Sequence, residues 1–134
     1  MKDAGELCRG LLRKAKSDRI AMEASLAAQA FDAGCFHAQQ TAEKCLKAFL
    51  ALQRVEFPYS HNLTKLTEIC ATIDATFRSL LPAVRPLTPY AVELRHDDSF
   101  WPSRQVAEEA RSSALAVFRF VLDRLPADIR KSAE

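Results

Sequence analysis

Glycine is scarce in this sequence, with 3 glycines among 134 residues, and the three never cluster. A fold built on many tight turns or strand hairpins is therefore not expected, and a glycine-rich phosphate loop is excluded. No run of about 18 apolar residues occurs, which is the length that a membrane-spanning helix needs. The first residues also lack the apolar segment of a secretory signal peptide. These absences predict a cytoplasmic protein without a membrane span.

Neither the net charge of the chain nor the spacing of its cysteines points to a ligand. The chain has 19 basic and 17 acidic residues, and a net charge of +2 is too small to indicate a nucleic-acid partner by itself. None of the four cysteines forms a Cys-x-x-Cys pair, so neither a zinc site nor a redox site is expected. Cys35 and Cys45 fall on apolar helix faces, where a free thiol behaves as a small hydrophobic group. We expect reduced, buried thiols, no metal site and no cofactor.

The strongest pattern in the sequence is an apolar repeat over residues 34–54. Apolar residues there recur at alternating steps of three and four, which is a heptad seam typical of a helix packed lengthwise against a neighbour. Two small residues in the seam predict a close helix–helix approach. The seam consists of Cys35, Ala38, Ala42, Cys45, Phe49 and Leu52.

A second long helix is predicted before this seam, over residues 4–31, where alanine and periodic apolar residues are frequent. The pattern predicts a bend near Ser17 and Asp18, with Asp18 capping a second segment. Gly34 is expected to mark the end of a helix, because glycine favours that position.

Helical patterns continue after a connector that Pro58 interrupts. Asn62 or Ser60 is expected to cap a third helix over residues 63–73. Two short helical pieces and a final helix, which begins after Ser103, are predicted over residues 77–84, 89–96 and 104–125.

These elements predict an all-α fold in one domain, because they contain no strand signal and no internal repeat. The expected architecture is an antiparallel, up-and-down bundle of four principal helices plus a short helix. The bundle should occupy residues 1–126, and residues 127–134 should form a polar, frayed C-terminal tail.

Three segments give the chain a family resemblance. Residues 38–48 are Ala-Gln-Gln-Thr-Ala-Glu-Lys-Cys-Leu-Lys-Ala, residues 61–63 are His-Asn-Leu, and residues 90–102 are Tyr-Ala-Val-Glu-Leu-Arg-His-Asp-Asp-Ser-Phe-Trp-Pro. With the helices around them, these segments resemble the HEPN family (higher eukaryotes and prokaryotes nucleotide-binding domain) over nearly the whole chain. The last segment is similar to a bacterial single-domain branch, which usually has Tyr at the position of His96.

The resemblance implies a compact bundle that self-associates as a homodimer or a higher oligomer. Many relatives are encoded beside a minimal nucleotidyltransferase, and the two together resemble a toxin–antitoxin pair. Active members are metal-independent ribonucleases that use an Arg, usually followed by a polar residue, and a His a few residues further on. Such a His exchanges protons with the RNA, and the Arg stabilises charge on the phosphate.

This chain keeps only part of that catalytic pair. Arg95 stands at the expected place and polar His96 follows it, but Phe100, Trp101 and Pro102 occupy the stretch where the second His should lie. The resemblance therefore implies a protein that acts by self-association and by binding a minimal nucleotidyltransferase, a nucleotide or RNA. The alternative is a metal-independent ribonuclease that uses Arg95 with His96 or His61.

Several residues near these motifs have two interpretations. Lys44, Lys47 and Arg95 are candidate nucleotide or phosphate contacts, while the alternatives are a solvated lysine face and an ion pair of Arg95 with Asp97, Asp98 or Glu43. Phe100 and Trp101 either seal the loop against the bundle or form a partner-facing patch. Two adjacent carboxylates do not by themselves make a hard-cation site, so no metal is expected there.

Overall fold

The computed structural model describes residues 2–134, which form an all-α bundle and contain no β-strand. The prediction of four principal helices is confirmed. They are α1 (Ala4–Ala27), α2 (Phe31–Leu52), α3 (Leu63–Ile73) and α5 (Arg104–Leu122). The short pieces are η1 (Ala75–Leu80), α4 (Leu81–Val84), η2 (Thr88–Tyr90), α6 (Ala127–Arg130) and η3 (Lys131–Ala133).

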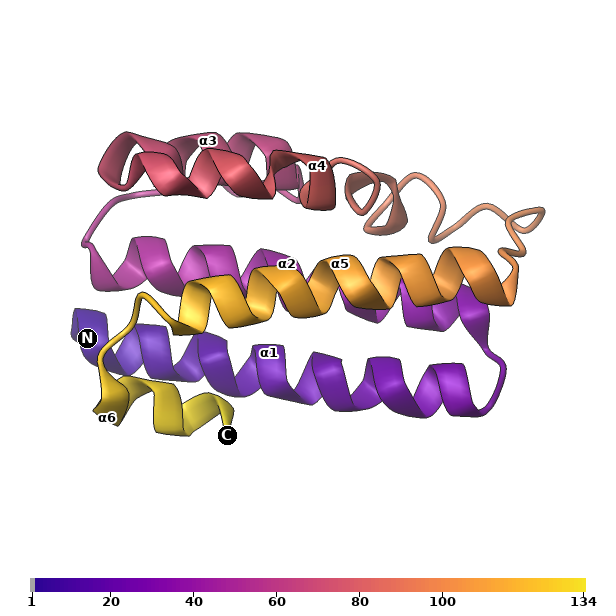
Figure 1. Ribbon diagram of the computed structural model, residues 1–134, viewed down its shortest axis with the longest axis horizontal. Helices are drawn as coiled ribbons and strands as arrows, with labels where there is room; N and C mark the ends of the chain where they lie inside the picture. The colour runs from indigo at the N-terminus through magenta and orange to yellow at the C-terminus, as the bar shows by residue number, and fades with distance from the viewer. Residues whose placement is uncertain (1) are drawn as a thin grey trace.

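The long helices lie side by side along the molecule. Helices α1 and α2 form an antiparallel pair that is joined by a tight turn at one end (Figure 1). Helix α5 begins at that same end and runs along α2 in the direction of α2, so the predicted antiparallel order holds for α1 and α2 but not for α2 and α5 (Figure 1). Helices α3 and α4 cover one side of the layer that the long helices α1, α2 and α5 form (Figure 1). The segment between α4 and α5, residues 85–103, therefore lies at the end of the bundle where α2 begins.

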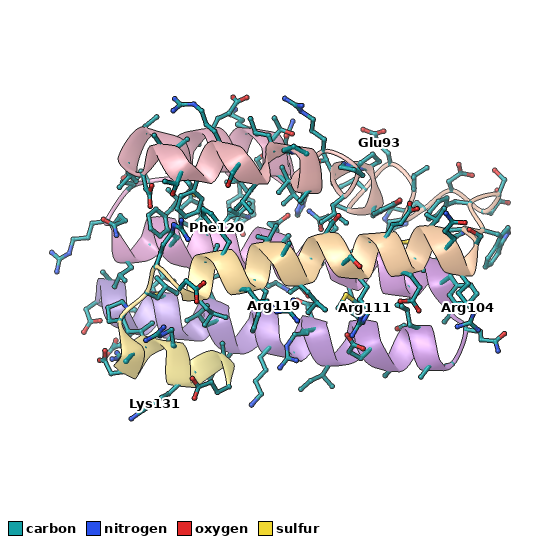
Figure 2. All side chains as sticks on the ribbon, viewed as in Figure 1. Glu93, Arg104, Arg111, Arg119, Phe120 and Lys131 are labelled. Carbon is teal, nitrogen blue, oxygen red and sulfur yellow. The ribbon has the colours of Figure 1, made fainter. Side chains whose placement is uncertain are left out.

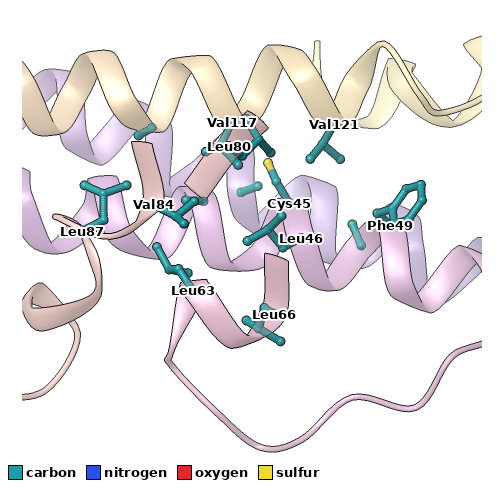
Figure 3. Packing of buried hydrophobic residues seen from close by; sticks show 14 of the residues in the cluster. Cys45, Leu46, Phe49, Leu63, Leu66, Leu80, Val84, Leu87, Val117 and Val121 are labelled. Carbon is teal, nitrogen blue, oxygen red and sulfur yellow. The ribbon is translucent and has the colours of Figure 1, made fainter. Parts of the chain in front are cut away.

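The predicted seam of α2 forms the centre of the core. Its first four residues are at most 1% exposed, and Phe49 is 3% exposed. In Figure 3 the labelled side chains of α2 lie between those of α3 and those of α5. Burying a side chain of Phe size stabilises a fold by about 2 kcal/mol, and Phe49 is the seam residue of that size that is buried. The labelled residues of the three helices are Cys45, Leu46, Phe49, Leu63, Leu66, Val117 and Val121.

Side chains cap the starts of α3 and α5, and the cap of α3 is one that the sequence predicts. The Asn62 side chain accepts a hydrogen bond from the backbone amide of Lys65 at the start of α3, at 3.1 Å. The Ser103 hydroxyl accepts one from the amide of Val106 at the start of α5, at 3.2 Å. Each cap satisfies an amide that has no partner inside its helix.

Two contacts fix the first half of α5 against the other long helices. Arg111 forms an ion pair with Glu23 of α1, with 2.7 Å between Nε and Oε1 (Figure 2). The guanidinium of Arg104 lies 5.1 Å from the ring centre of Phe31, the first residue of α2 (Figure 2). These contacts hold the start of α5, and with it the preceding loop, beside the start of α2.

The expected role of Gly34 is wrong, because Gly34 lies inside the first turns of α2. The chain reverses instead at residues 28–30, where Gln29 takes the left-handed conformation with a φ of 63°. A Cβ atom on Gly34 would lie 2.5 Å from the terminal methyl of Leu26 in α1. The glycine therefore allows α1 and α2 to approach closely, and it does not end a helix.

Two other local predictions differ from the structure. Helix α1 continues without a break through Asp18, whose side chain points inward and is 8% exposed as a residue. The helix predicted over residues 89–96 is only the single turn η2 followed by further turns. Here a tertiary contact holds the segment, because the Tyr90 ring stacks on Phe100.

The expectation of a frayed C-terminal tail is also wrong. Residues 127–133 form α6 and η3, which pack against α1 (Figure 1). Ile129 is 5% exposed and Ala133 is 2% exposed, so this segment contributes to the core. The ion pair between Arg9 and Asp128, at 3.1 Å, adds a contact at the surface.

Two other kinds of feature are absent from the described part of the chain. No helix among residues 2–134 is long and apolar enough to cross a membrane. Within the same residues, no three His, Cys, Asp or Glu side chains gather in a way that could hold a metal ion.

Candidate binding site at the Arg95 loop

A cavity of about 290 Å³ opens where the loop between η2 and α5 meets the start of α2. Tyr90, Phe100 and Trp101 form aromatic walls, while Arg95 and His96 contribute polar edges. The loop ends at the Ser103 cap, and α2 contributes Asp32 from its first turn. The cavity therefore combines side chains from segments about 60 residues apart in the sequence.

Arg95 is held by an aromatic ring and not by a carboxylate. Its guanidinium carbon lies 4.3 Å from the ring centre of Phe36 in α2, a cation–π contact that orients the charged group. Among residues 2–134, no carboxylate lies within ion-pair distance of Arg95. The expected alternative of an ion pair with Asp97, Asp98 or Glu43 is therefore not formed. The guanidinium keeps its donors for a bound anion.

The two aromatic residues of the loop have different environments. Phe100 is partly buried and stacks on Tyr90, with 5.7 Å between ring centres and 27° between ring planes. Burial also raises the pKa of Tyr90. Trp101, in contrast, is 72% exposed. Phe100 closes the loop against the bundle, and Trp101 offers a free aromatic surface beside the cavity.

Carboxylates also line the cavity and limit what it can bind. Asp97 accepts hydrogen bonds from the Ser99 amide at 2.9 Å and from the Ser99 hydroxyl at 2.6 Å, and these bonds lower the pKa of Asp97. Asp32 and Asp98 line the same space. With three carboxylates and one guanidinium, the cavity disfavours a ligand with many negative charges. It offers acceptors to a ligand that has hydroxyl or amino donors.

The candidate lysines are already paired within the chain. Lys44 forms an ion pair with Asp18 of α1, and the same carboxylate lies 2.9 Å from Nδ1 of His37. Lys47 lies 3.1 Å from Oε2 of Glu43, one turn before it on α2. Each lysine therefore has a carboxylate partner inside the fold, which reduces the charge available to a phosphate.

Glu43 is the centre of a buried polar network. It is 4% exposed, and Oε1 accepts a hydrogen bond from the Gln39 amide at 3.0 Å and lies 2.8 Å from Nδ1 of His61. Gln39 also donates to the backbone carbonyl of His61 at 3.2 Å. These contacts attach the connector after α2 to α2 itself. They explain Glu43 and Gln39 as residues that hold the connector in place.

The family of the chain follows from its match over most of the bundle. Residues 8–125 match the model of the HEPN domain. The chain belongs to the HEPN domain family. The matched range ends at Leu125, one residue before the boundary predicted from the sequence.

Two solved structures share the HEPN fold. The crystal structure of TT1696 from Thermus thermophilus has 27% identity and a TM-score of 0.77, and the match covers 88% of this chain and 98% of that chain. The crystal structure of ST0689, an archaeal HEPN homologue, has 19% identity and a TM-score of 0.71, with coverage of 92% and 98%. No curated protein sequence matches the chain.

The HEPN fold brings four of the seven predicted site residues together at one cavity and leaves the other three outside it. Arg95, His96, Phe100 and Trp101 all line the cavity described above. Lys44 and Lys47 lie on α2 in ion pairs, and His61 lines a different cavity of about 340 Å³. Sequence reasoning missed the contacts of Asp18 with α2, because residues distant in sequence meet there and no local pattern indicates them.

Proposed function

We propose that this HEPN protein works by association: it forms a homodimer and binds a nucleotide ligand, in the form of single-stranded RNA, at the Arg95 loop. The observation that carries the proposal is that one cavity is lined both by Arg95, which has no carboxylate partner among residues 2–134, and by a tryptophan that is 72% exposed. Trp and Arg are the side chains most enriched where binding energy concentrates. An aromatic face stacks on a base, and a guanidinium binds a phosphate.

The charge of the cavity favours RNA over a nucleoside triphosphate. A triphosphate would bring several negative charges to a cavity that is lined by one guanidinium and three carboxylates. Each RNA nucleotide carries a single negative charge, and its ribose and base supply donors for Asp32 and Asp98. We therefore expect RNA and nucleoside monophosphates to bind more tightly than ATP.

A minimal nucleotidyltransferase is the protein partner that the HEPN resemblance implies. Trp101 supports this part of the proposal as an anchor residue, because an exposed tryptophan beside a cavity is typical of an interface centre. The toxin–antitoxin role would follow from such a complex. Copurification with the product of a neighbouring nucleotidyltransferase gene, and its loss in Trp101→Ala, is the expected result.

Binding should be tested by fluorescence anisotropy of a short, labelled single-stranded RNA of mixed sequence. Arg95→Ala should weaken binding by about tenfold or more, which corresponds to a charge-assisted hydrogen bond of about 1.5 kcal/mol. Arg85→Ala is the matched control, since Arg85 is also exposed but does not line the cavity. Equal affinity of wild type and Arg95→Ala would contradict the proposal, and stronger binding of ATP would contradict the choice of RNA.

Self-association should be measured separately by light scattering. The proposal expects twice the 15.0 kDa mass of the chain at micromolar concentration. A monomer at all accessible concentrations would refute the homodimer.

The second candidate function is a metal-independent ribonuclease, and it needs an acid–base group near Arg95. Phe100, Trp101 and Pro102 stand where the loop should provide one. His61 is held by Glu43 at the connector, and the exposed His96 has no hydrogen-bond partner among residues 2–134 that would orient its imidazole.

A further inference from the structure

A groove of about 550 Å³ follows the first half of α1, at the end of the bundle away from the Arg95 loop (Figure 1). Leu7, which is 40% exposed, and Leu11 give it an apolar lining. Leu7 also lines an adjoining cavity of about 350 Å³, where Val55 and Phe57 of the connector after α2 extend the apolar surface. That cavity has one basic and one acidic side chain, so it adds no net charge. We call the part along α1 the α1 groove.

The α1 groove is positively charged, and its cations have no partners. Lys2, Arg13 and Lys14 line it, and no carboxylate does. Among residues 2–134, no carboxylate lies within ion-pair distance of these three side chains, in contrast to Lys44 and Lys47 on α2. The groove therefore attracts a negatively charged partner and repels a cationic one.

Gly10 lies in the middle of the groove, inside α1, and the fold does not require a glycine there. Glycine in a helix interior is destabilising relative to alanine. A Cβ atom on Gly10 would lie 3.9 Å from Nζ of Lys2, which is an ordinary contact. At Gly34, in contrast, a Cβ atom would collide with Leu26. The missing side chain of Gly10 therefore leaves room for the close approach of a group from outside the chain.

Three other occupants fit this groove less well than an acidic, apolar segment of a protein. A second copy that presented the same groove would place three cations against three cations. A bilayer is flat and binds a protruding apolar face, whereas the apolar face of α1 is turned into the bundle. Single-stranded RNA stacks on aromatic side chains, and the α1 groove has none.

We propose that the α1 groove docks an acidic amphipathic helix of another protein. Apolar side chains of that helix pack on Leu7 and Leu11, and Gly10 lets its backbone come close. Carboxylates that flank the apolar stripe pair with Arg13 and Lys14. From Leu7 to Ser17 the groove follows α1 for about 15 Å, which matches about three turns of a docked helix.

This surface is separate from the proposed RNA site. Helix α1 has 24 residues and is about 36 Å long, and the groove lies along its first half. The Arg95 loop lies at the other end of the bundle, where α2 begins (Figure 1). A helix in the groove leaves the loop accessible, so this inference does not depend on the binding of RNA.

The test is fluorescence anisotropy of a labelled helical peptide of about 14 residues, which is about four turns. The peptide carries leucines at i, i+3, i+4 and i+7 and glutamates on its other positions. Wild type should bind it saturably and more weakly as salt is added, and a peptide with lysine in place of every glutamate should not bind. Absence of binding of the acidic peptide, or equal binding of the two peptides, would overturn the proposal.

Two double variants test the charges of the groove. Arg13→Glu with Lys14→Glu should weaken binding of the acidic peptide by about tenfold or more. Lys65→Glu with Lys131→Glu is the matched control, because both lysines are exposed outside the groove and the net charge changes by the same amount. The control should bind the peptide much more tightly than the groove variant, and equal affinities would refute the role of the groove.

Gly10→Leu tests the shape of the groove without a change in charge. Leucine is a better helix former than glycine, so the Tm measured by circular dichroism should be unchanged or higher. The new side chain fills the groove, so affinity for the acidic peptide should fall by about tenfold or more. Peptide affinity equal to that of wild type would contradict the proposed close approach at Gly10.

Three further results would assign the groove to another occupant and overturn the proposal. They are a specific loss, in Arg13→Glu with Lys14→Glu and not in the control double variant, of binding to phosphatidylglycerol vesicles, of the mass of a dimer, or of binding to single-stranded RNA. RNA binding without peptide binding overturns this inference alone. Peptide binding without RNA binding overturns only the proposed RNA site.

Discussion

Replacing Glu43 by Gln should be one of the most damaging single polar substitutions in this fold. The glutamate is 4% exposed and interacts with Lys47 at 3.1 Å, with His61 at 2.8 Å and with Gln39 at 3.0 Å. The neutral amide of a glutamine at position 43 keeps one acceptor oxygen. It leaves the ammonium of Lys47, whose side chain is 14% exposed, without a counter-ion. Removing one partner of a buried ion pair costs about 3 kcal/mol or more.

The lower end of that range applies to Glu43, because the imidazole of His61 is 52% exposed and water can replace its contact. We expect about 3 kcal/mol of lost unfolding free energy, or about 10 °C in Tm for a domain of this size. Urea denaturation followed by circular dichroism measures the change, with an unchanged m-value as evidence of a common two-state transition.

Two further variants make this prediction specific. Glu68→Gln on the exposed face of α3 should change stability by less than about 0.5 kcal/mol. The double variant Glu43→Leu with Lys47→Met removes both charges, and it should be more stable than Glu43→Gln because no buried charge remains unpaired. A loss below about 1 kcal/mol in Glu43→Gln, or a double variant that is no better, would refute this account of the network.

Three other predictions follow from burial and hydrogen bonding. Ile129→Ala should lower the free energy of unfolding, measured by chemical denaturation, by about 2 kcal/mol. Asp128→Ala, which removes the surface ion pair with Arg9, should lower it by less than about 1 kcal/mol. Equal effects would contradict the packing of the C-terminal segment against α1. Burial raises the pKa of the thiols of Cys8 and Cys35 to about 11, and that of the thiols of Cys45 and Cys70 to about 12. A thiol reagent at neutral pH should therefore label the folded protein only slowly. Fast labelling of the folded protein would contradict the burial of these thiols. Hydrogen bonds from Thr76 and the guanidinium of Arg124 lower the pKa of Asp74, so its stabilising effect is present above the ordinary Asp pKa and is lost as pH falls through the lowered value. The difference in Tm between wild type and Asp74→Ala should therefore shrink in acid, and a constant difference would argue against this role.

The sequence predicts the elements of this fold wherever a local signal decides them. The bounds of α3 and its cap at Asn62 follow from the cap residue and the apolar periodicity, and the α2 seam follows from its heptad spacing. Gly34 is misread because the same residue serves either a helix end or a close helix contact, and only the position of Leu26 distinguishes the two.

The remaining differences also come from contacts between distant residues. The C-terminal residues are polar in composition, and their helical turns form because α1 offers a surface for two apolar side chains. At the site, the sequence identifies the Arg95 loop through its motif. The two partners of Asp18, and the histidine partner of Glu43, lie 18 to 26 residues away in the sequence, so no local spacing reveals them.

The most direct test of nucleotide binding at the Arg95 loop is the intrinsic fluorescence of Trp101, the only tryptophan in the chain. This side chain is 72% exposed at the edge of the cavity, so a base that stacks there must change its emission. Titration with single-stranded RNA should give a saturable change in wild type and a much weaker response in Arg95→Ala. Emission that stays constant, or that changes identically in the two proteins, would contradict the proposed site.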